Sequence, residues 1–396
     1  MSSPSKLVVT GQRLVLGGVL LLLLLPALQA LWPLVAVRPL SGATLDAPRP
    51  VFSWRTLLDS RYQAAQESYF TEQLGFRPWL VRVRNQVSFT LFNKPLTDGI
   101  ILGKDQNLFQ YNSIIAYIGE SHPSEDQFER RARQLRQVQD SLRAHGTQLL
   151  FVLAPGKPRI VPHLLPDKYN RWQTTSDYHS TQQYFDKYGV NNLDAAALLL
   201  RWQAALPPYP LFTRTGTHWS GYATARVADT LFHRIEQLTG QDLPDFAQQG
   251  PPTVATRAAD LRYSDKDLED LLNLMQDITP YPTAYPHVVF GSDKGKQRLN
   301  ALIIGDSFTQ SFYTFYPYFD RLLTPDARFW YYKNTVYWPA QTPPGESRNV
   351  KDLNLAEQLR GRKLVLLLAM EANLHPPDFG FGFVDEALKV YGIPAQ

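Results

Sequence analysis

The sequence predicts an α/β protein with a mostly parallel sheet that is covered by helices on both faces. Short apolar runs alternate along the chain with segments of helical periodicity, and this alternation is typical of parallel sheets. A length of 396 residues and an apolar content of 44% are sufficient for a large buried core. The length fits two or three domains, or one large α/β domain.

The expected elements follow in chain order. Residues 54–93 mix aromatic and aliphatic side chains with charges, and Gly75 is expected to divide them into two helices. Ser124 has a Gln three residues later, the spacing of a capping box, and Ser220 precedes an apolar stripe of helical period. Further helices are expected within residues 124–144, 178–188, 220–238, 308–323 and 353–360, and strands within residues 100–103, 149–153, 190–193, 299–304, 328–332 and 363–369.

An N-terminal membrane segment precedes these elements. Residues 14–37 are apolar apart from Gln29, which is long enough to span a bilayer. Lys6 and Arg13 precede the segment, so the positive-inside rule places the N-terminus in the cytoplasm and the rest of the chain outside it. A cleaved signal peptide is the alternative, but its apolar region is shorter and ends at a small-residue site. Residues 28–30 (Leu-Gln-Ala) match such a site poorly, which favours an uncleaved anchor.

The chain is therefore expected to have four parts. Residues 1–13 form a cytoplasmic tail, residues 14–37 a transmembrane signal anchor, and the Pro-containing residues 38–53 a linker. Residues 54–396 form the main domain. Within it, residues 240–298 are rich in Pro, Asp and Gln, and we interpret them as an insertion beside the sheet with a helical portion at 265–275.

Composition excludes several classes of function. The chain has no cysteine, which excludes disulfides, thiolate catalysis and Cys-ligated metal sites. Its net charge is +4, but residues 1–45 hold three basic residues and no acid, leaving 37 basic against 36 acidic residues in the remainder. Such a near-neutral body does not fit electrostatic binding of nucleic acid. No metal-ligand spacing, phosphate loop or dinucleotide fingerprint occurs, so no metal and no cofactor is expected.

Ser307 is the candidate nucleophile. It lies in the run Ile-Ile-Gly-Asp-Ser-Phe at residues 303–308, where an apolar strand is followed directly by a helix. The carboxyl ends of strands are where open α/β sheets bind ligands, and a helix N-terminus favours a developing oxyanion. Gly305 permits close approach of a substrate, and Asp306 lies at the same edge. The alternative is that Ser307 only caps the helix.

His218 is the candidate base. It lies in the run Thr-Gly-Thr-His-Trp-Ser at residues 215–220, just before a predicted helix. A serine nucleophile needs a base within hydrogen-bond reach, and neutral histidine is suited to that role near pH 7. The alternative is a histidine that packs against Trp219 or completes a cap.

Two other strand ends carry polar candidates. Glu371 and Asn373 directly follow the last predicted strand, where Glu371 is expected to orient a histidine and Asn373 to donate to an oxyanion. Lys157 follows another strand in the run Ala-Pro-Gly-Lys and is a candidate for an anionic sugar. The alternatives are that Glu371 is an acid on a surface loop, that Asn373 only forms a turn, and that Lys157 is a solvated lysine in a turn.

These motifs together resemble the SGNH hydrolase-like family of alginate O-acetyltransferases of the AlgX/AlgJ type. The resemblance covers about residues 50–390 and includes the runs Thr-His-Trp at 217–219, Gly-Asp-Ser-Phe at 305–308 and Glu-Ala-Asn-Leu at 371–374. It implies a three-layer α/β/α domain in the periplasm, held at the inner membrane. It also implies transfer of acetyl groups to a secreted polysaccharide, with Ser307 as nucleophile and His218 as general base. A membrane-bound O-acyltransferase is the partner that it implies.

The sequence departs from the family pattern at one position. The family has Asp-x-His-Trp, and here Gly216 stands at the acid position. Loss of the third triad member lowers turnover by ~10⁴ in serine proteases. We hypothesise that Glu371 replaces it. A weakly active or inactive glycan-binding or scaffold protein in a polysaccharide modification or export complex is the alternative, and a plain secreted esterase is a third possibility.

Overall fold

The computed structural model describes residues 6–42, 47–120, 122–169, 175–341, 345–376 and 379–394. It consists of two compact units. One unit extends to Asp98 and includes Glu269–Asp277, and the other contains Gly99–Leu268 and the chain from Ile278 onward. The sequence assigned residues 54–98 to the main domain, whereas the structure groups them with the N-terminal unit.

The N-terminal unit is helical. Its helices are α1 (Lys6–Leu31), α2 (Trp54–Leu58), α3 (Arg61–Gln73) and α4 (Arg77–Phe92). The break at residues 74–76 follows the expectation from Gly75. Within α1, the stretch Arg13–Leu31 is the one helix of the described chain that is long and apolar enough to cross a membrane.

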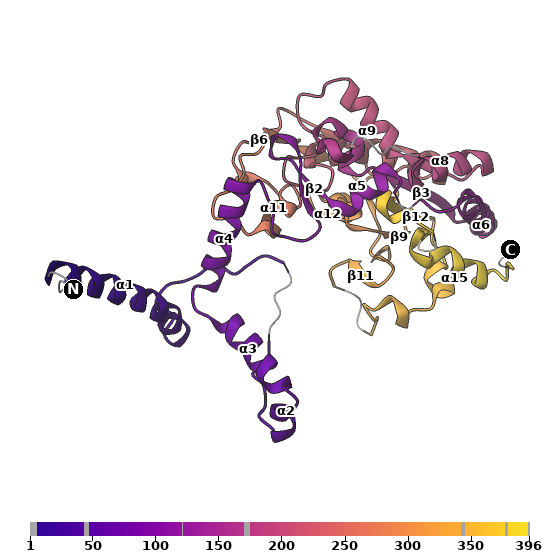
Figure 1. Ribbon diagram of the computed structural model, residues 1–396. Coiled ribbons are helices and arrows are strands. Elements are labelled where there is room, and N and C mark those ends of the chain that lie inside the picture. The colour runs from indigo at the N-terminus through magenta and orange to yellow at the C-terminus, as the bar shows by residue number, and fades with distance from the viewer. Residues whose placement is uncertain are drawn as a thin grey trace. The chain divides into compact units, whose positions relative to one another are not determined.

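A six-stranded sheet organises the second unit (Figure 1). Its strand order is β11-β10-β9-β12-β3-β4, and all neighbours are parallel except β10 and β11. The prediction of a mostly parallel sheet is confirmed. The strands are β3 (Gln148–Ala154), β4 (Asn192–Asp194), β9 (Ala301–Gly305), β10 (Arg328–Tyr331), β11 (Thr335–Trp338) and β12 (Leu364–Met370).

Helices cover both faces of the sheet because both sets of strand side chains are apolar. Leu150, Ile303 and Leu366 belong to one core, whereas Leu149, Leu302 and Val365 belong to the other. On the first face lie α9 (Ala195–Ala204), α10 (Gly221–Thr239), α12 (Ser307–Thr314) and α13 (Tyr318–Leu322), and on the second α6 (Glu125–Ala144), α8 (Asp177–Tyr188), α14 (Leu355–Leu359) and α15 (Phe383–Val390).

The helix expected at residues 308–323 is two helices in the structure. α12 ends at Thr314, and α13 begins at Tyr318, after Pro317. Proline cannot donate a backbone hydrogen bond inside a helix, which explains the break.

Smaller elements surround the sheet. α5 (Tyr111–Ile118), α7 (Lys157–Ile160) and the hairpin of β1 (Ile100–Leu102) and β2 (Leu108–Gln110) lie near the start of the unit. The segment interpreted as an insertion forms the pairs β5 (Phe246–Gln248) with β8 (Val288–Phe290) and β6 (Thr253–Ala255) with β7 (Thr283–Tyr285), and it contains α11 (Asp267–Leu272).

Candidate active site

Ser307 stands at the carboxyl edge of the sheet, as expected. β9 ends at Gly305, and Ser307 is the first residue of α12. Asp306 caps this helix, because its Oδ1 accepts a hydrogen bond from the backbone of Phe308 at 3.0 Å. A Cβ at Gly305 would lie 2.3 Å from Thr309 Oγ1 of α12 and 2.9 Å from Leu368 O of β12, so only glycine fits between the helix and the neighbouring strand.

His218 reaches Ser307 from the loop before α10. Its Nε2 lies 2.7 Å from Ser307 Oγ. The loop ends at Ser220, whose hydroxyl caps α10 by accepting from the backbone of Ala223 at 3.2 Å. The side chain of His218 is largely buried, whereas Ser307 is half-buried.

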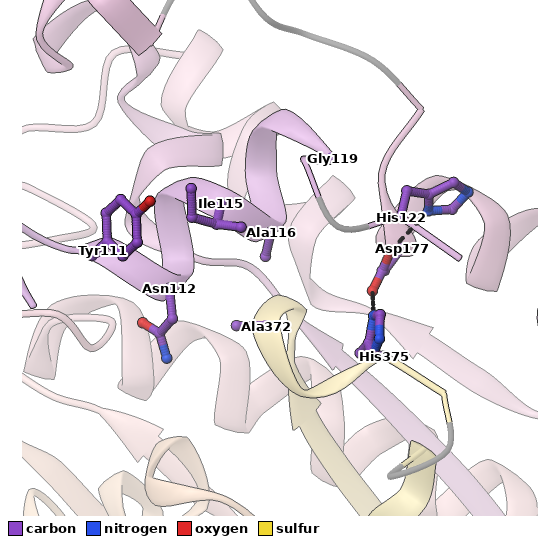
Figure 2. A pocket seen from close by; sticks show the side chains of 9 residues that line it. All are labelled: Tyr111, Asn112, Ile115, Ala116, Gly119, His122, Asp177, Ala372 and His375. Carbon is purple, nitrogen blue, oxygen red and sulfur yellow. Dashed lines mark hydrogen bonds and ion pairs between the residues drawn. The ribbon is translucent and has the colours of Figure 1, made fainter. Parts of the chain in front are cut away.

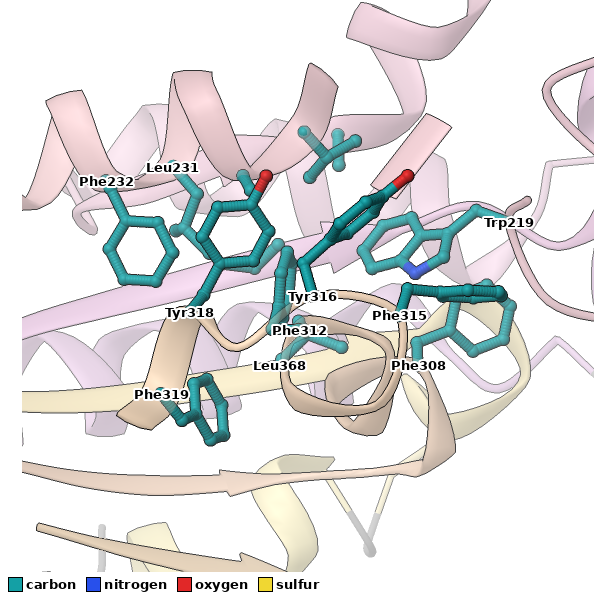
Figure 3. Packing of buried hydrophobic residues seen from close by; sticks show 14 of the residues in the cluster. Trp219, Leu231, Phe232, Phe308, Phe312, Phe315, Tyr316, Tyr318, Phe319 and Leu368 are labelled. Atoms are coloured by element: carbon teal, nitrogen blue, oxygen red, sulfur yellow. The ribbon is translucent and has the colours of Figure 1, made fainter. Parts of the chain in front are cut away.

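The residues that follow His218 and Ser307 fix this contact. Trp219 and Phe308 are fully buried, and their rings meet edge to face with centroids 5.2 Å apart (Figure 3). Phe312 from the next turn of α12 packs on the same indole. Edge-to-face aromatic contacts have a preferred geometry, so the paired rings hold the His218 loop against the start of α12.

A third residue, Asp267 at the start of α11, contacts His218 from its other side. Its Oδ2 lies 2.7 Å from His218 Nδ1. Its Oδ1 accepts backbone hydrogen bonds from Thr217 at 2.9 Å and from Leu268 at 2.8 Å. The carboxylate is therefore held from both sides, and it faces the nitrogen of His218 opposite to the one that faces Ser307.

The structure explains why Gly216 does not carry the acid. A Cβ on Gly216 would lie 2.6 Å from Thr213 Oγ1 and 2.8 Å from the carbonyl oxygen of Ser264. The backbone that leads to Asp267 thus occupies the space that a side chain at residue 216 would need. The acid that faces His218 therefore comes from the insertion and not from the His218 loop.

The hypothesis that Glu371 orients His218 is wrong. Glu371 is fully buried, and both of its oxygens accept hydrogen bonds from Arg159, one of them from Nε at 2.9 Å. Arg159 also donates to Ser176 Oγ at 3.0 Å. Glu371 stands at the expected edge of the sheet, but its charge is used to neutralise a buried guanidinium.

Asp306 and Asn373 form a second contact at this edge. The fully buried carboxylate of Asp306 accepts from the backbone of Met370 at 2.6 Å and from Asn373 Nδ2 at 2.8 Å. Burial raises the pKa of Asp306, and these hydrogen bonds oppose the rise. Asp306 thus joins the start of α12 to the end of β12 and does not face a substrate. The side chain of Asn373 is only half-buried.

Lys157 does not reach the site either. It is buried, and its Nζ donates to the carbonyl oxygens of Leu108 at 2.9 Å and Arg214 at 2.8 Å. Burial lowers its pKa well below the ordinary value. The expectation of an anionic sugar at Lys157 is therefore wrong, because its Nζ instead binds the backbone four residues before His218. In the part of the chain that the structure describes, no group of His and acidic residues has the geometry of a metal site.

Asp265, two residues before Asp267, is a buried carboxyl group. Its Oδ2 accepts a hydrogen bond from the Tyr285 hydroxyl at 2.7 Å. Burial raises its pKa to about 7, against about 3.9 in an unfolded chain. Between these values the folded protein keeps a proton that the unfolded chain releases. The free energy of unfolding therefore falls as pH rises through this window, by up to about 1.4 kcal/mol for each pH unit.

Asp265→Asn is expected to remove this contribution, since the amide does not titrate and still accepts from Tyr285. Urea midpoints of the variant should exceed those of the parent at pH 7, and the gap should shrink toward pH 4. The exposed Asp260→Asn is the control. Parallel pH curves for parent and Asp265→Asn would show that Asp265 is ionised in the folded protein.

A Ser–His–Asp chain of hydrogen bonds at the carboxyl edge of a parallel sheet defines a serine hydrolase-like α/β protein. Residues 100–327 match the family model described as the SGNH hydrolase-like domain of the acetyltransferase AlgX. This match covers more than half of the chain, and the chain belongs to that family.

The chain is also similar to curated relatives and to solved structures. A protein described as "probable alginate O-acetylase AlgJ" from Pseudomonas aeruginosa is 27% identical over 255 residues, which are 63% of this chain and 59% of the relative. Its counterpart from Pseudomonas putida is 25% identical over 227 residues, 57% of this chain and 56% of the relative. The chain thus spans a little over half the length of these curated relatives. The O-acetyltransferase domain of Pseudomonas putida AlgJ aligns with a TM-score of 0.45 and 16% identity over 73% of this chain and 99% of that domain.

Proposed function

We propose that the protein is a serine-dependent O-acetyltransferase that acts on a secreted polysaccharide through an acetyl-serine intermediate. The observation that supports it most is the hydrogen-bonded chain from Ser307 through His218 to Asp267, with distances of 2.7 Å at both steps. The same observation favours catalysis over a purely structural role for the domain, since a scaffold has no need of an aligned acid, base and nucleophile.

The first half of the reaction acetylates Ser307. His218 Nε2 takes the proton of Ser307 Oγ as that oxygen attacks the carbonyl carbon of an acetyl ester. Asp267 orients the imidazole and stabilises its protonated form. The tetrahedral intermediate then expels the donor's oxygen, which receives the proton from His218. The backbone N–H of Ser307, at the N-terminus of α12, has no acceptor among the described residues and is the proposed oxyanion donor, with Asn373 nearby.

The second half transfers the acetyl group to the glycan. A sugar hydroxyl gives its proton to His218 and attacks the acetyl carbonyl, and Ser307 Oγ leaves and regains a proton from His218. For this acceptor to be a secreted polymer, α1 must hold the domain on the outer side of the inner membrane, in the periplasm. A membrane-bound O-acyltransferase is the proposed source of acetyl groups.

The test is acetylation of the full chain in detergent by an activated ester such as p-nitrophenyl acetate. Intact mass should show one added acetyl group, and peptide mapping should locate it on Ser307. Ser307→Ala and His218→Ala should both abolish the adduct, because one removes the nucleophile and the other its base. His233→Ala is the matched control, since His233 is exposed on α10. Equal labelling of the parent and Ser307→Ala would refute the proposal and favour a binding or scaffold role.

A further inference from the structure

We propose that the hollow between α5 and residues 372–375 is a binding subsite for an uncharged sugar of the acceptor polysaccharide. The inference rests on the proposed function, and it adds the place where the polymer lies and its charge class. It predicts that the acceptor is a neutral glycan, in contrast to a polymer of uronic acids.

The hollow lies beside the catalytic edge of the sheet. Its volume is about 420 Å³, and its lining includes Tyr111 and Asn112 from α5 and Ala372 and His375 beyond β12 (Figure 2). This volume is within the usual range for ligand pockets. Ala372 is also part of the short turn whose Asn373 binds the residue before Ser307.

A second hollow adjoins the first. It has a volume of about 430 Å³, is lined by Tyr332, Asn334 and Asn373, and shares Ala372 and His375 with the first. The segment 372–375 is thus flanked by two hollows, one of which reaches the Asn373 amide. Two adjoining hollows suit a chain of sugars better than a single small molecule.

A carboxylate fixes the orientation of His375. Asp177 lies 3.1 Å from His375 Nδ1 with one oxygen and 2.8 Å from His122 Nδ1 with the other (Figure 2). A nitrogen that faces a carboxylate carries the proton, so in the neutral tautomer of His375 this is Nδ1, and Nε2 presents the lone pair. No described residue hydrogen-bonds that atom, and the side chain of His375 is 46% exposed. His375 is therefore poised to accept a hydrogen bond from a sugar hydroxyl.

α5 supplies complementary groups across the hollow. Tyr111 and Asn112 are exposed, and neither side chain makes a hydrogen bond to any residue within the described ranges. The amide of Asn112 both donates and accepts, as a sugar hydroxyl does. The Tyr111 ring offers an apolar face with a polar tip. Such a mixture of one flat ring and a few neutral polar groups suits an uncharged sugar.

The charges of the two hollows argue against a uronic acid. No Lys or Arg is among the residues that line either hollow in the described part of the chain. The carboxylate of Asp177 is present instead. The imidazole of His122 also lines the first hollow, but its two nitrogens already face the carboxylates of Asp177 and Glu125. Recognition of a carboxylate usually uses Arg or Lys, so a uronate in this hollow would meet negative charge without a free cationic partner.

Glycan binding to the full-length Ser307→Ala protein in detergent tests the proposal without any chemistry. Short oligomers of glucose, galactose, mannose and N-acetylglucosamine are titrated beside short oligouronates. Binding is measured by isothermal titration calorimetry or by saturation-transfer NMR. We expect at least one neutral oligomer to bind at least about tenfold more tightly than every oligouronate. His375→Gln and Asn112→Ala should each weaken binding by about three- to tenfold, the loss typical of one hydrogen bond, whereas His233→Ala should not change it.

Three results would overturn the proposal. They are oligouronate binding as tight as neutral binding, neutral binding that neither His375→Gln nor Asn112→Ala weakens, and no binding of any oligomer at millimolar concentration. Melting temperatures of the variants check that each remains folded. Because Ser307 acetylation by the activated ester needs no glycan, failure of the subsite and failure of the proposed chemistry are separate outcomes.

Discussion

Asp267→Asn is expected to lower the rate of acetyl transfer by about 10⁴-fold, the loss seen when the triad Asp of a serine protease becomes Asn. The amide retains the size of the carboxylate but cannot stabilise the protonated imidazole, and it favours the wrong tautomer of His218. The measurement is the rate of Ser307 acetylation by p-nitrophenyl acetate, followed by intact mass.

Asp260→Asn is the matched control for this prediction. It changes an exposed Asp of the same insertion, paired with Arg257, and should leave the rate unchanged. A rate for Asp267→Asn within tenfold of the parent would mean that Ser307 and His218 act as a dyad. A tenfold or greater loss in the control would instead point to damage of the insertion.

Glu371→Gln is expected to reduce stability by about 3–5 kcal/mol, the cost of leaving a buried charge without its partner. The guanidinium of Arg159 would stay buried and lose the carboxylate that now accepts two of its hydrogen bonds. Urea unfolding at constant pH measures the change.

The double variant Arg159→Met with Glu371→Gln separates the ion pair from the packing. It removes both charges, so it should recover part of the lost stability. Glu357→Gln, at an exposed position on α14, should shift the free energy of unfolding by less than about 0.5 kcal/mol. If Glu371→Gln unfolds like the parent, the pair contributes little, and Arg159 is held by Ser176 and by the rings of Tyr117 and Tyr178.

Much of the fold was predictable because each buried strand is a continuous apolar run. β3, β9 and β12 lie within two residues of their expected positions, since only a central parallel strand needs such a run. α5 and α9 were not expected. α9 is nearly all apolar, Ala195–Leu200, and therefore has no polar face from which a helical period can be read.

Ser307 and His218 were predictable for a local reason, and Asp267 was not. Each of the first two stands at a strand or helix boundary beside a large aromatic, and those boundaries are visible in the sequence. Asp267 lies 49 residues from His218, within the segment interpreted as an insertion and away from the ends of the predicted sheet strands. The available signal was the run Asp-Lys-Asp at 265–267 just before Leu268, which marks the start of a helix. The sequence favours Glu371 instead, because its place after the last strand does not reveal that its carboxylate accepts hydrogen bonds from Arg159.

The strand order has a consequence for how the protein is made. β12 lies between β9 and β3, although it is the last strand to leave the ribosome. Until residues 364–370 are synthesised, β11-β10-β9 and β3-β4 are two separate ribbons with open edges. Unpaired edges of this kind promote association with other chains. The backbone of Met370 and the amide of Asn373, which bind Asp306, also arrive last. The start of α12, which carries Ser307, therefore gains these contacts only after almost the whole chain has been translated, and we expect a chain truncated before residue 364 to lack them and to be prone to aggregate.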